Sequence, residues 1–176
     1  MRARKTVITA ATCALVMLPA ATAMAGSGPA PAPAKQQRAA ATSTAPSEQG
    51  NPRSAAAKAA AVCSDAYQIG TTAYIDRAGA HVASVKQFYS PSCNVNYGYL
   101  WVWDSFRNKY SAYDTSIGVY NYAKDTVAGQ LSWKATHQQE FWSGAANTVD
   151  VCTAGVGSLR LPGDPAPTFA YSSKRC

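Results

Sequence analysis

The side chains best suited to acid–base chemistry in this chain are its two histidines, His81 and His137. His137 stands three residues before Glu140, a spacing that would bring an imidazole and a carboxylate together on one helical turn. A general base also needs a nucleophile within hydrogen-bond distance, and the chain contains neither a G-x-S-x-G nor an H-E-x-x-H motif. We therefore predict solvated histidines and assign no catalytic residue, and a hydrolase is the second alternative function.

The carboxylates and cysteines form no recognisable ligand set either. The aspartates are scattered, so nothing selects two of them for the paired-carboxylate chemistry of a glycosidase. The cysteines and histidines show no C-x-x-C or H-x-x-x-H spacing that would indicate zinc. The sequence therefore predicts no metal and no cofactor.

Aromatic side chains offer a different chemistry, the stacking of rings on the sugar units of a polymer. Every Tyr, Trp and Phe follows Val62. In residues 97–103 the odd positions are all aromatic, but Leu100 and Val102 make the opposite face apolar too, which predicts a central strand covered on both faces. Asn and Ser surround the later tyrosines, which favours exposure there. The candidate ligand-binding residues are Tyr97, Tyr110, Tyr113, Tyr120 and Tyr122.

A third possibility is a protease-inhibiting loop. Leu159 and Arg160 lie in a Gly/Pro-rich stretch between Cys152 and Cys176. A disulfide-framed loop that presents a basic residue is preorganised for binding, so it loses little entropy in a complex. A small secreted protease inhibitor is therefore the first alternative function.

The beginning of the chain resembles an export signal. The basic MRARK is followed by an apolar run from Thr6 to about Leu18 and by Ala23-Met-Ala25, and we expect cleavage after Ala25. The apolar run is too short for a stable membrane anchor. Cleavage would remove Cys13 and leave four cysteines in an oxidising compartment, which predicts two disulfides and a secreted protein.

The pairing of these cysteines follows from a predicted hairpin. Strands near residues 65–75 and 81–90 flank a three-residue loop, Arg77-Ala78-Gly79, with Gly79 in the left-handed position of a G1 bulge. That loop pairs residues such as Asp76 with Ala80 and Tyr67 with Tyr89, and it places Cys63 opposite Cys93. We therefore predict the disulfides Cys63–Cys93 and Cys152–Cys176.

Composition divides the chain into three parts. Residues 26–61 contain no aromatic residue and no Val, Ile, Leu or Met, so we expect a disordered Pro/Ala-rich linker, or a propeptide, after the signal peptide of residues 1–25. The run that starts at Ser54 is a possible short helix with Ser54 as its N-cap. Residues 62–176 form the folded domain.

The net charge of the whole chain is +7, but most of the excess of basic residues precedes Val62, so we expect no nucleic-acid partner.

Within the domain the dominant hydrophobic period is two. Residues 67–75 and Leu131–Ala135 alternate, and no segment keeps an apolar stripe over three helical turns. The fold class is therefore all-β, a small antiparallel β-sandwich or a partly open barrel with two disulfides. One helical turn after Thr136 is predicted by the capping-box sequence Thr136-His-Gln-Gln139.

Three motifs resemble a domain family of exported proteins from high-GC bacteria. The chain has Cys63-Ser-Asp-Ala66, then Val85-Lys-Gln-Phe-Tyr-Ser-Pro-Ser-Cys93, then the aromatic strand, where that family has C-x-x-A, [V/L]-x-x-x-Y-S-P-x-C and an aromatic strand. The resemblance covers about residues 63–106. It implies a small disulfide-bonded β domain, and because the family has no established activity, no functional residue is transferred from it.

These observations favour a secreted, non-enzymatic binding or structural module of the cell envelope or extracellular space. Its ligand is not identified, and its partner is expected to be an envelope polymer or another extracellular protein.

Overall fold

In the computed structural model, residues 43–176 are described. The predicted signal peptide and residues 26–42 of the predicted linker lie outside the described residues. The described elements, in chain order, are α2 (Ala55–Ala59), β1 (Tyr67–Arg77), β2 (Ala80–Ser90), β3 (Val95–Val102), α3 (Asp104–Arg107), β4 (Tyr113–Asn121), β5 (Thr126–Thr136), β6 (Glu140–Trp142), β7 (Thr153–Arg160) and β8 (Thr168–Tyr171).

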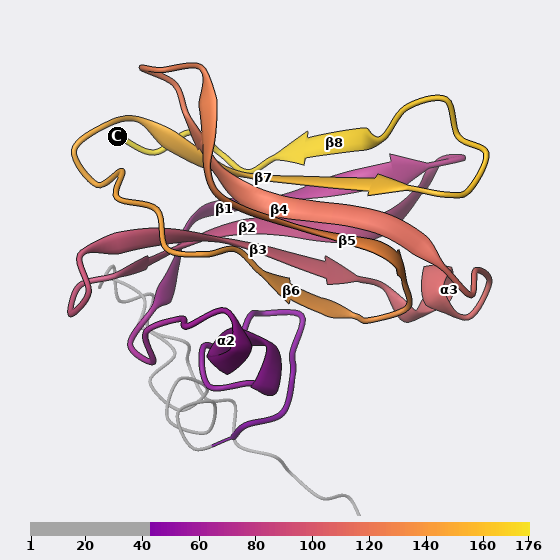
Figure 1. Cartoon of the computed structure of the whole chain (residues 1–176), viewed down its shortest axis with the longest axis horizontal. Helices are drawn as coiled ribbons and strands as arrows, with labels where there is room; N and C mark the ends of the chain where they lie inside the picture. Colours follow the sequence, from indigo (N-terminus) through magenta and orange to yellow (C-terminus); the bar gives the residue numbers. More distant parts are fainter. Residues whose placement is uncertain (1–42) are drawn as a thin grey trace, which may run out of the picture. The chain divides into compact units, whose positions relative to one another are not determined.

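The strands form two antiparallel sheets that lie one above the other (Figure 1). The first sheet has the strand order β1-β2-β3-β6, and the second has the order β5-β4-β7-β8. This confirms the predicted all-β fold, and it is a sandwich rather than a closed barrel.

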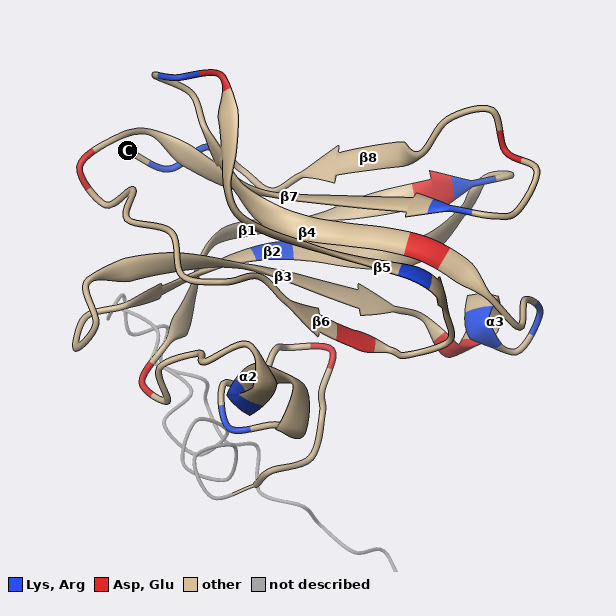
Figure 2. Cartoon of the chain, viewed as in Figure 1, with Lys and Arg blue, Asp and Glu red and all other residues tan. Residues whose placement is uncertain are grey.

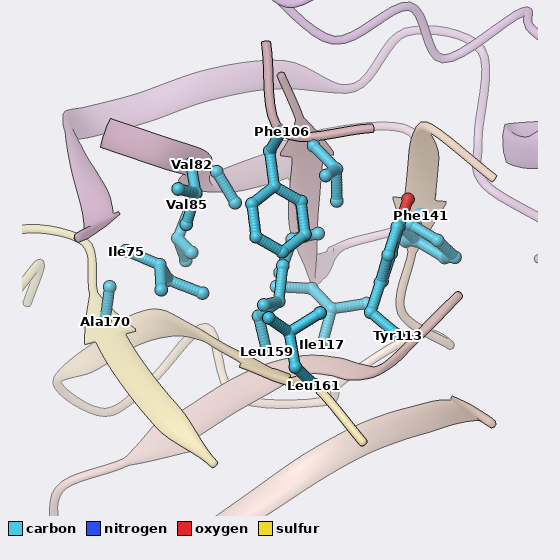
Figure 3. Close-up of a cluster of buried hydrophobic side chains, with 13 residues drawn as sticks. Ile75, Val82, Val85, Phe106, Tyr113, Ile117, Phe141, Leu159, Leu161 and Ala170 are labelled. Carbon is cyan, nitrogen blue, oxygen red and sulfur yellow. The ribbon is translucent and has the colours of Figure 1, made fainter. Parts of the chain in front are cut away.

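Side chains from both sheets meet in the space between them (Figure 3). Ile75 and Val85 come from the first sheet, and Ile117 and Leu159 come from the second, all of them fully buried. Gly157 allows this close approach, because a Cβ at that position would lie 2.7 Å from the side chains of Val85 and Leu100. The sheets therefore pack at native density without room for a further methyl group at this point.

The hairpin of β1 and β2 differs from its prediction in the turn and agrees with it at the base. Ala78 and Gly79 have φ values of 49° and 77°, so they form a two-residue turn of type I′, whose twist suits a hairpin, in place of the predicted three-residue loop. Asp76 consequently pairs with His81 and not with Ala80. Two register shifts farther along the ladder bring Tyr67 opposite Tyr89 as predicted.

Both predicted disulfides are present. Cys63–Cys93 joins the chain just before β1 to the turn after β2, with a Cα–Cα distance of 6.5 Å. Cys152–Cys176 joins the start of β7 to the last residue of the chain. Such bridges stabilise small domains mainly by restricting the unfolded chain, by about 3 kcal/mol each.

Residues 43–61, which we call the N-terminal strap, pack on the outer face of the first sheet. The hydroxyl of Tyr99 donates a hydrogen bond to the carbonyl of Ser47, and Nζ of Lys86 donates to the carbonyl of Glu48. Gly50 lies against the ring of Phe88, where a Cβ would come within 2.3 Å of the ring. Ala57 of α2 is fully buried in this interface.

The strap corrects the expectation of a disordered segment for residues 43–61. Its own side chains are too small to drive folding, but the sheet supplies the apolar surface, and the strap supplies backbone carbonyls for the buried polar groups. The predicted helix does form, because the side chain of Ser54 accepts a hydrogen bond from the N–H of Ala57. The aromatic strand β3 is therefore covered on both faces, as the sequence predicted.

Deleting residues 1–61 should destabilise the domain, whereas a chain beginning at Ser43 should keep its stability. The longer deletion uncovers Phe88, Tyr99 and Trp142, which are all buried. We expect the free energy of unfolding to fall by at least about 3 kcal/mol, the equivalent of two buried aromatic side chains. Thermal unfolding and binding of a hydrophobic dye measure the change. Equal stability and equal dye binding for the two chains would show that the strap contributes nothing.

The strap also covers Glu140. Its carboxylate accepts a hydrogen bond of 3.1 Å from Nε1 of Trp142, and burial raises the pKa of Glu140 above its ordinary value of 4.5. A raised folded-state pKa means that the folded protein holds this proton more tightly than the unfolded chain does. The contribution of Glu140 to the free energy of unfolding is therefore complete at a pH below the ordinary pKa of 4.5. It is lost as the pH rises through the raised pKa of the folded protein.

Glu140→Gln should therefore remove one pH-dependent part of the stability. Gln keeps an oxygen for the Trp142 indole and does not ionise, and any loss of other hydrogen bonds is independent of pH. We expect the free energy of unfolding of the variant, relative to that of the wild type, to increase from about pH 4 to about pH 8. Urea unfolding at several pH values measures this difference. A difference that stays constant over that range would contradict the burial of an ionisable Glu140.

Candidate functional site: the outer face of the second sheet

The second sheet has one face on the core and one face turned away from it. Ile117 and Val119 of β4 point into the sandwich, so Tyr120 points outward. Val156 of β7 lies opposite Tyr171 of β8, and the next outward pair along these strands joins Ser158 and Phe169. Of the two described helices, α2 packs on the first sheet and α3 lies at the end of the sandwich, so neither covers this outer face (Figure 1).

We call Tyr120, Tyr122, Phe169 and Tyr171 the tyrosine face. Phe169 is 53% exposed, Tyr171 is 46% exposed and Tyr122 is 39% exposed. The ring of Tyr120 lies between its neighbours, with its centroid 4.8 Å from that of Tyr122 and 5.4 Å from that of Tyr171. Both contacts are edge-to-face, the arrangement that aromatic pairs prefer. The rings of Tyr120, Tyr122 and Tyr171 therefore hold one another in place before any ligand binds.

The tyrosine face carries little charge. In the second sheet, charged residues gather at the turns and strand ends, while β8 and the middle of β4 and β7 carry none (Figure 2). Next to the outward Val156 of β7 lie Ser116 and Ser158, whose hydroxyls are 2.7 Å apart. A ring-bearing surface with few charges and with a hydroxyl beside it suits contact with an uncharged polymer of sugar rings better than with a phosphate backbone.

Two polar contacts fix the edge of the tyrosine face. The hydroxyl of Tyr120 donates to a carboxylate oxygen of Asp125, and this hydrogen bond raises the pKa of Tyr120. Nζ of Lys174 lies 4.6 Å from the ring centroid of Tyr122, a cation–π contact. Contacts with Asp125 and Lys174 therefore hold Tyr120 and Tyr122 in place at this edge.

Of the five predicted tyrosines, the structure brings two together on this face, Tyr120 and Tyr122. Tyr97 and Tyr113 are buried and are not available to a ligand. Tyr113 donates its hydroxyl to the carbonyl of Gln138, and burial raises the pKa of Tyr113 to about 12. Tyr110 is half-buried against Phe106.

Phe169 and Tyr171 belong to the tyrosine face and were not predicted. They lie in β8, which is only four residues long and follows a Pro-rich turn, so its alternation spans too few positions to indicate a strand. The alternation Phe169-Ala170-Tyr171 was nevertheless a usable signal, because Ala170 is buried and its two neighbours are exposed.

The predicted inhibitory loop is wrong in its placement. Leu159 is buried in the core, and Arg160 is the last residue of strand β7. Arg160 lies opposite Asp114, with 3.6 Å between Nη2 of the arginine and Oδ2 of the aspartate. Two of the glycines that suggested a loop, Gly155 and Gly157, stand within β7, where they let the sheets approach. A reactive loop of the inhibitor type is therefore not present at these residues.

Both histidines are exposed, and His137 does not form with Glu140 the pair that one helical turn would have allowed. His137 contacts the backbone carbonyl of Arg107 through Nε2, whereas Glu140 is turned under the strap, and no helical turn follows Thr136. His81 contacts the carboxylate of Asp76 instead, and both side chains are exposed. This imidazole–carboxylate pair lies on the open surface, without the enclosed pocket that general-base catalysis uses.

Within residues 43–176, no group of three or more His, Cys, Asp or Glu side chains is arranged to hold a metal ion. The same part of the chain has no helix with the length and hydropathy needed to cross a membrane. The two disulfides are typical of proteins in an oxidising, extracellular environment.

Comparisons with family models, curated proteins and solved structures found no match to the chain. The resemblance to exported proteins with a Y-S-P-x-C motif stays a prediction.

Proposed function

We propose that this protein is a secreted, non-enzymatic binding module of the cell envelope or extracellular space, and that the tyrosine face is its contact surface. The observation that carries the proposal is the group of three contacting rings, Tyr120, Tyr122 and Tyr171, with the exposed Phe169 on the same side of β8, on a sheet face that neither described helix covers. A contiguous exposed aromatic patch costs solubility, so it marks an interaction site more often than chance exposure does. The export signal and the two disulfides support an extracellular place of action.

The partner that suits this surface is an envelope polymer built of neutral sugar rings. The apolar faces of sugar rings stack on Tyr and Phe, and the half-buried hydroxyl of Ser116, which lies beside the buried Ser158, can hydrogen-bond a sugar edge. Charged polymers suit it less well, because β8 and the middle of β4 and β7 carry no charged residue, and the contacts of Asp125 and Lys174 are with Tyr120 and Tyr122 at one edge (Figure 2). The enzyme and inhibitor alternatives have weaker support, since the exposed His81–Asp76 pair lacks a pocket and Arg160 lies within a strand.

Phe169→Ala and Tyr171→Ala should each weaken binding to an insoluble envelope polysaccharide by about fivefold to thirtyfold, the effect of truncating an aromatic anchor. Tyr171→Phe should bind like the wild type, because the ring is retained. Co-sedimentation with purified chitin, cellulose and peptidoglycan measures the binding.

Tyr67→Ala is the matched control, because Tyr67 is 47% exposed but lies on β1 of the first sheet. It should leave polymer binding unchanged. Absence of binding to all three polymers, or an equal loss in the Tyr67→Ala variant, would refute the role of the tyrosine face.

A further inference from the structure

The space between the two sheets changes from apolar to polar toward one end of the sandwich. Gln87, Asn96 and Thr153 occupy inward-facing positions there, and each is at most 3% exposed. Nε2 of Gln87 donates to Oγ1 of Thr153 across the two sheets, at 2.6 Å. Apolar residues at these positions would extend the core of Figure 3 and stabilise it more, because buried polar groups must first lose water.

A cavity of about 370 Å³ opens at this polar end. Its polar lining is formed by Tyr89, Asn94, Asn96, Asp150, Thr153 and Arg175. Ile69, Val149 and Val151 supply apolar patches between these groups. The volume lies near the lower end of the range for small-molecule sites, about 300–1,000 Å³.

An unsatisfied buried group lies beside the wall of this cavity. Oε1 of Gln87 is buried and accepts no hydrogen bond from any residue of 43–176. Gln87 is hydrogen-bonded to Thr153 and lies opposite Ile69, and both of these residues line the cavity. Buried polar groups without a partner are few in folded proteins, and each one calls for an explanation, such as a bound molecule that supplies the missing donor.

The lining also indicates the class of ligand. Tyr89, Asn94, Asn96 and Thr153 offer neutral donors and acceptors, and Asp150 and Arg175 add one side-chain charge of each sign. Within the described chain, neither of these charged residues forms an ion pair. Hydroxyl-rich molecules with apolar ring faces match this mixture of groups.

We propose that this cavity binds a soluble neutral saccharide of one or two sugar units. The cavity is distinct from the tyrosine face, because none of Tyr120, Tyr122, Phe169 and Tyr171 lines it. The saccharide site therefore does not depend on polymer binding by the tyrosine face.

The test is a titration of the full folded protein with N,N′-diacetylchitobiose, cellobiose and maltose, followed by NMR of backbone and side-chain amides. We expect at least one of these disaccharides to shift the signals of Asn94, Asn96 and Arg175, with a dissociation constant in the millimolar range or below. Tyr89→Phe and Asn94→Gly should each weaken this binding about fivefold to tenfold, the effect of one lost hydrogen bond. Glycine suits residue 94, because Asn94 has a φ of 52°.

Two further variants separate ligand binding from folding. Val151→Phe places a larger side chain at the cavity wall and should abolish the shifts while retaining the wild-type unfolding temperature. Tyr67→Phe removes the hydroxyl of the ring that packs edge-on against Tyr89 outside the cavity lining, and it should bind like the wild type. Absence of any shift with all three disaccharides would overturn the proposal. A response to glycine or to a dipeptide alone would overturn the ligand class.

Discussion

Strand β3 is apolar on both faces, and the arrangement of the whole domain follows from the need to cover both of them. Leu100 and Val102 pack against the second sheet, while Tyr97 and Tyr99 point the other way. A sandwich of two sheets buries only one face of each sheet. The first sheet therefore requires a third layer, and the N-terminal strap supplies it with alanines, a short helix and backbone carbonyls. The second sheet has no such layer among the described residues, and its aromatic residues stay at the surface.

The sequence predicted those parts of the fold that depend on local patterns. Alternation of apolar residues indicated strands, and the cysteine pairing followed from the hairpin. The predicted loop was one residue too long. Ala78 adopts a left-handed backbone conformation, which is uncommon for a residue other than glycine and was therefore not predicted from the sequence. The register at Tyr67 and Tyr89 was nevertheless correct, since the irregularities of the ladder compensate for the shorter turn. Cys63 and Cys93 meet for that reason.

The strap was not predictable in this way, because its order comes from the surface of another element. Ser47 and Glu48 contribute only their backbone carbonyls, which every residue has. The candidate site was predictable in part. Tyr120 and Tyr122 stand among polar residues and are on the surface, but Tyr97 shows that strand parity cannot reveal which face another segment covers. Phe169 and Tyr171 escaped prediction because they lie in a strand too short to show a period.

The central claim is that the strap seals one aromatic face while the other stays open, and nitration of tyrosines in the folded protein tests it most directly. Tetranitromethane labels accessible phenol rings, and peptide mass mapping then locates the labels. We expect labels on Tyr122 and Tyr171, and protection of Tyr97 and Tyr99 until the protein is unfolded. Labelling of Tyr97 and Tyr99 in the native protein as readily as of Tyr171 would contradict the account.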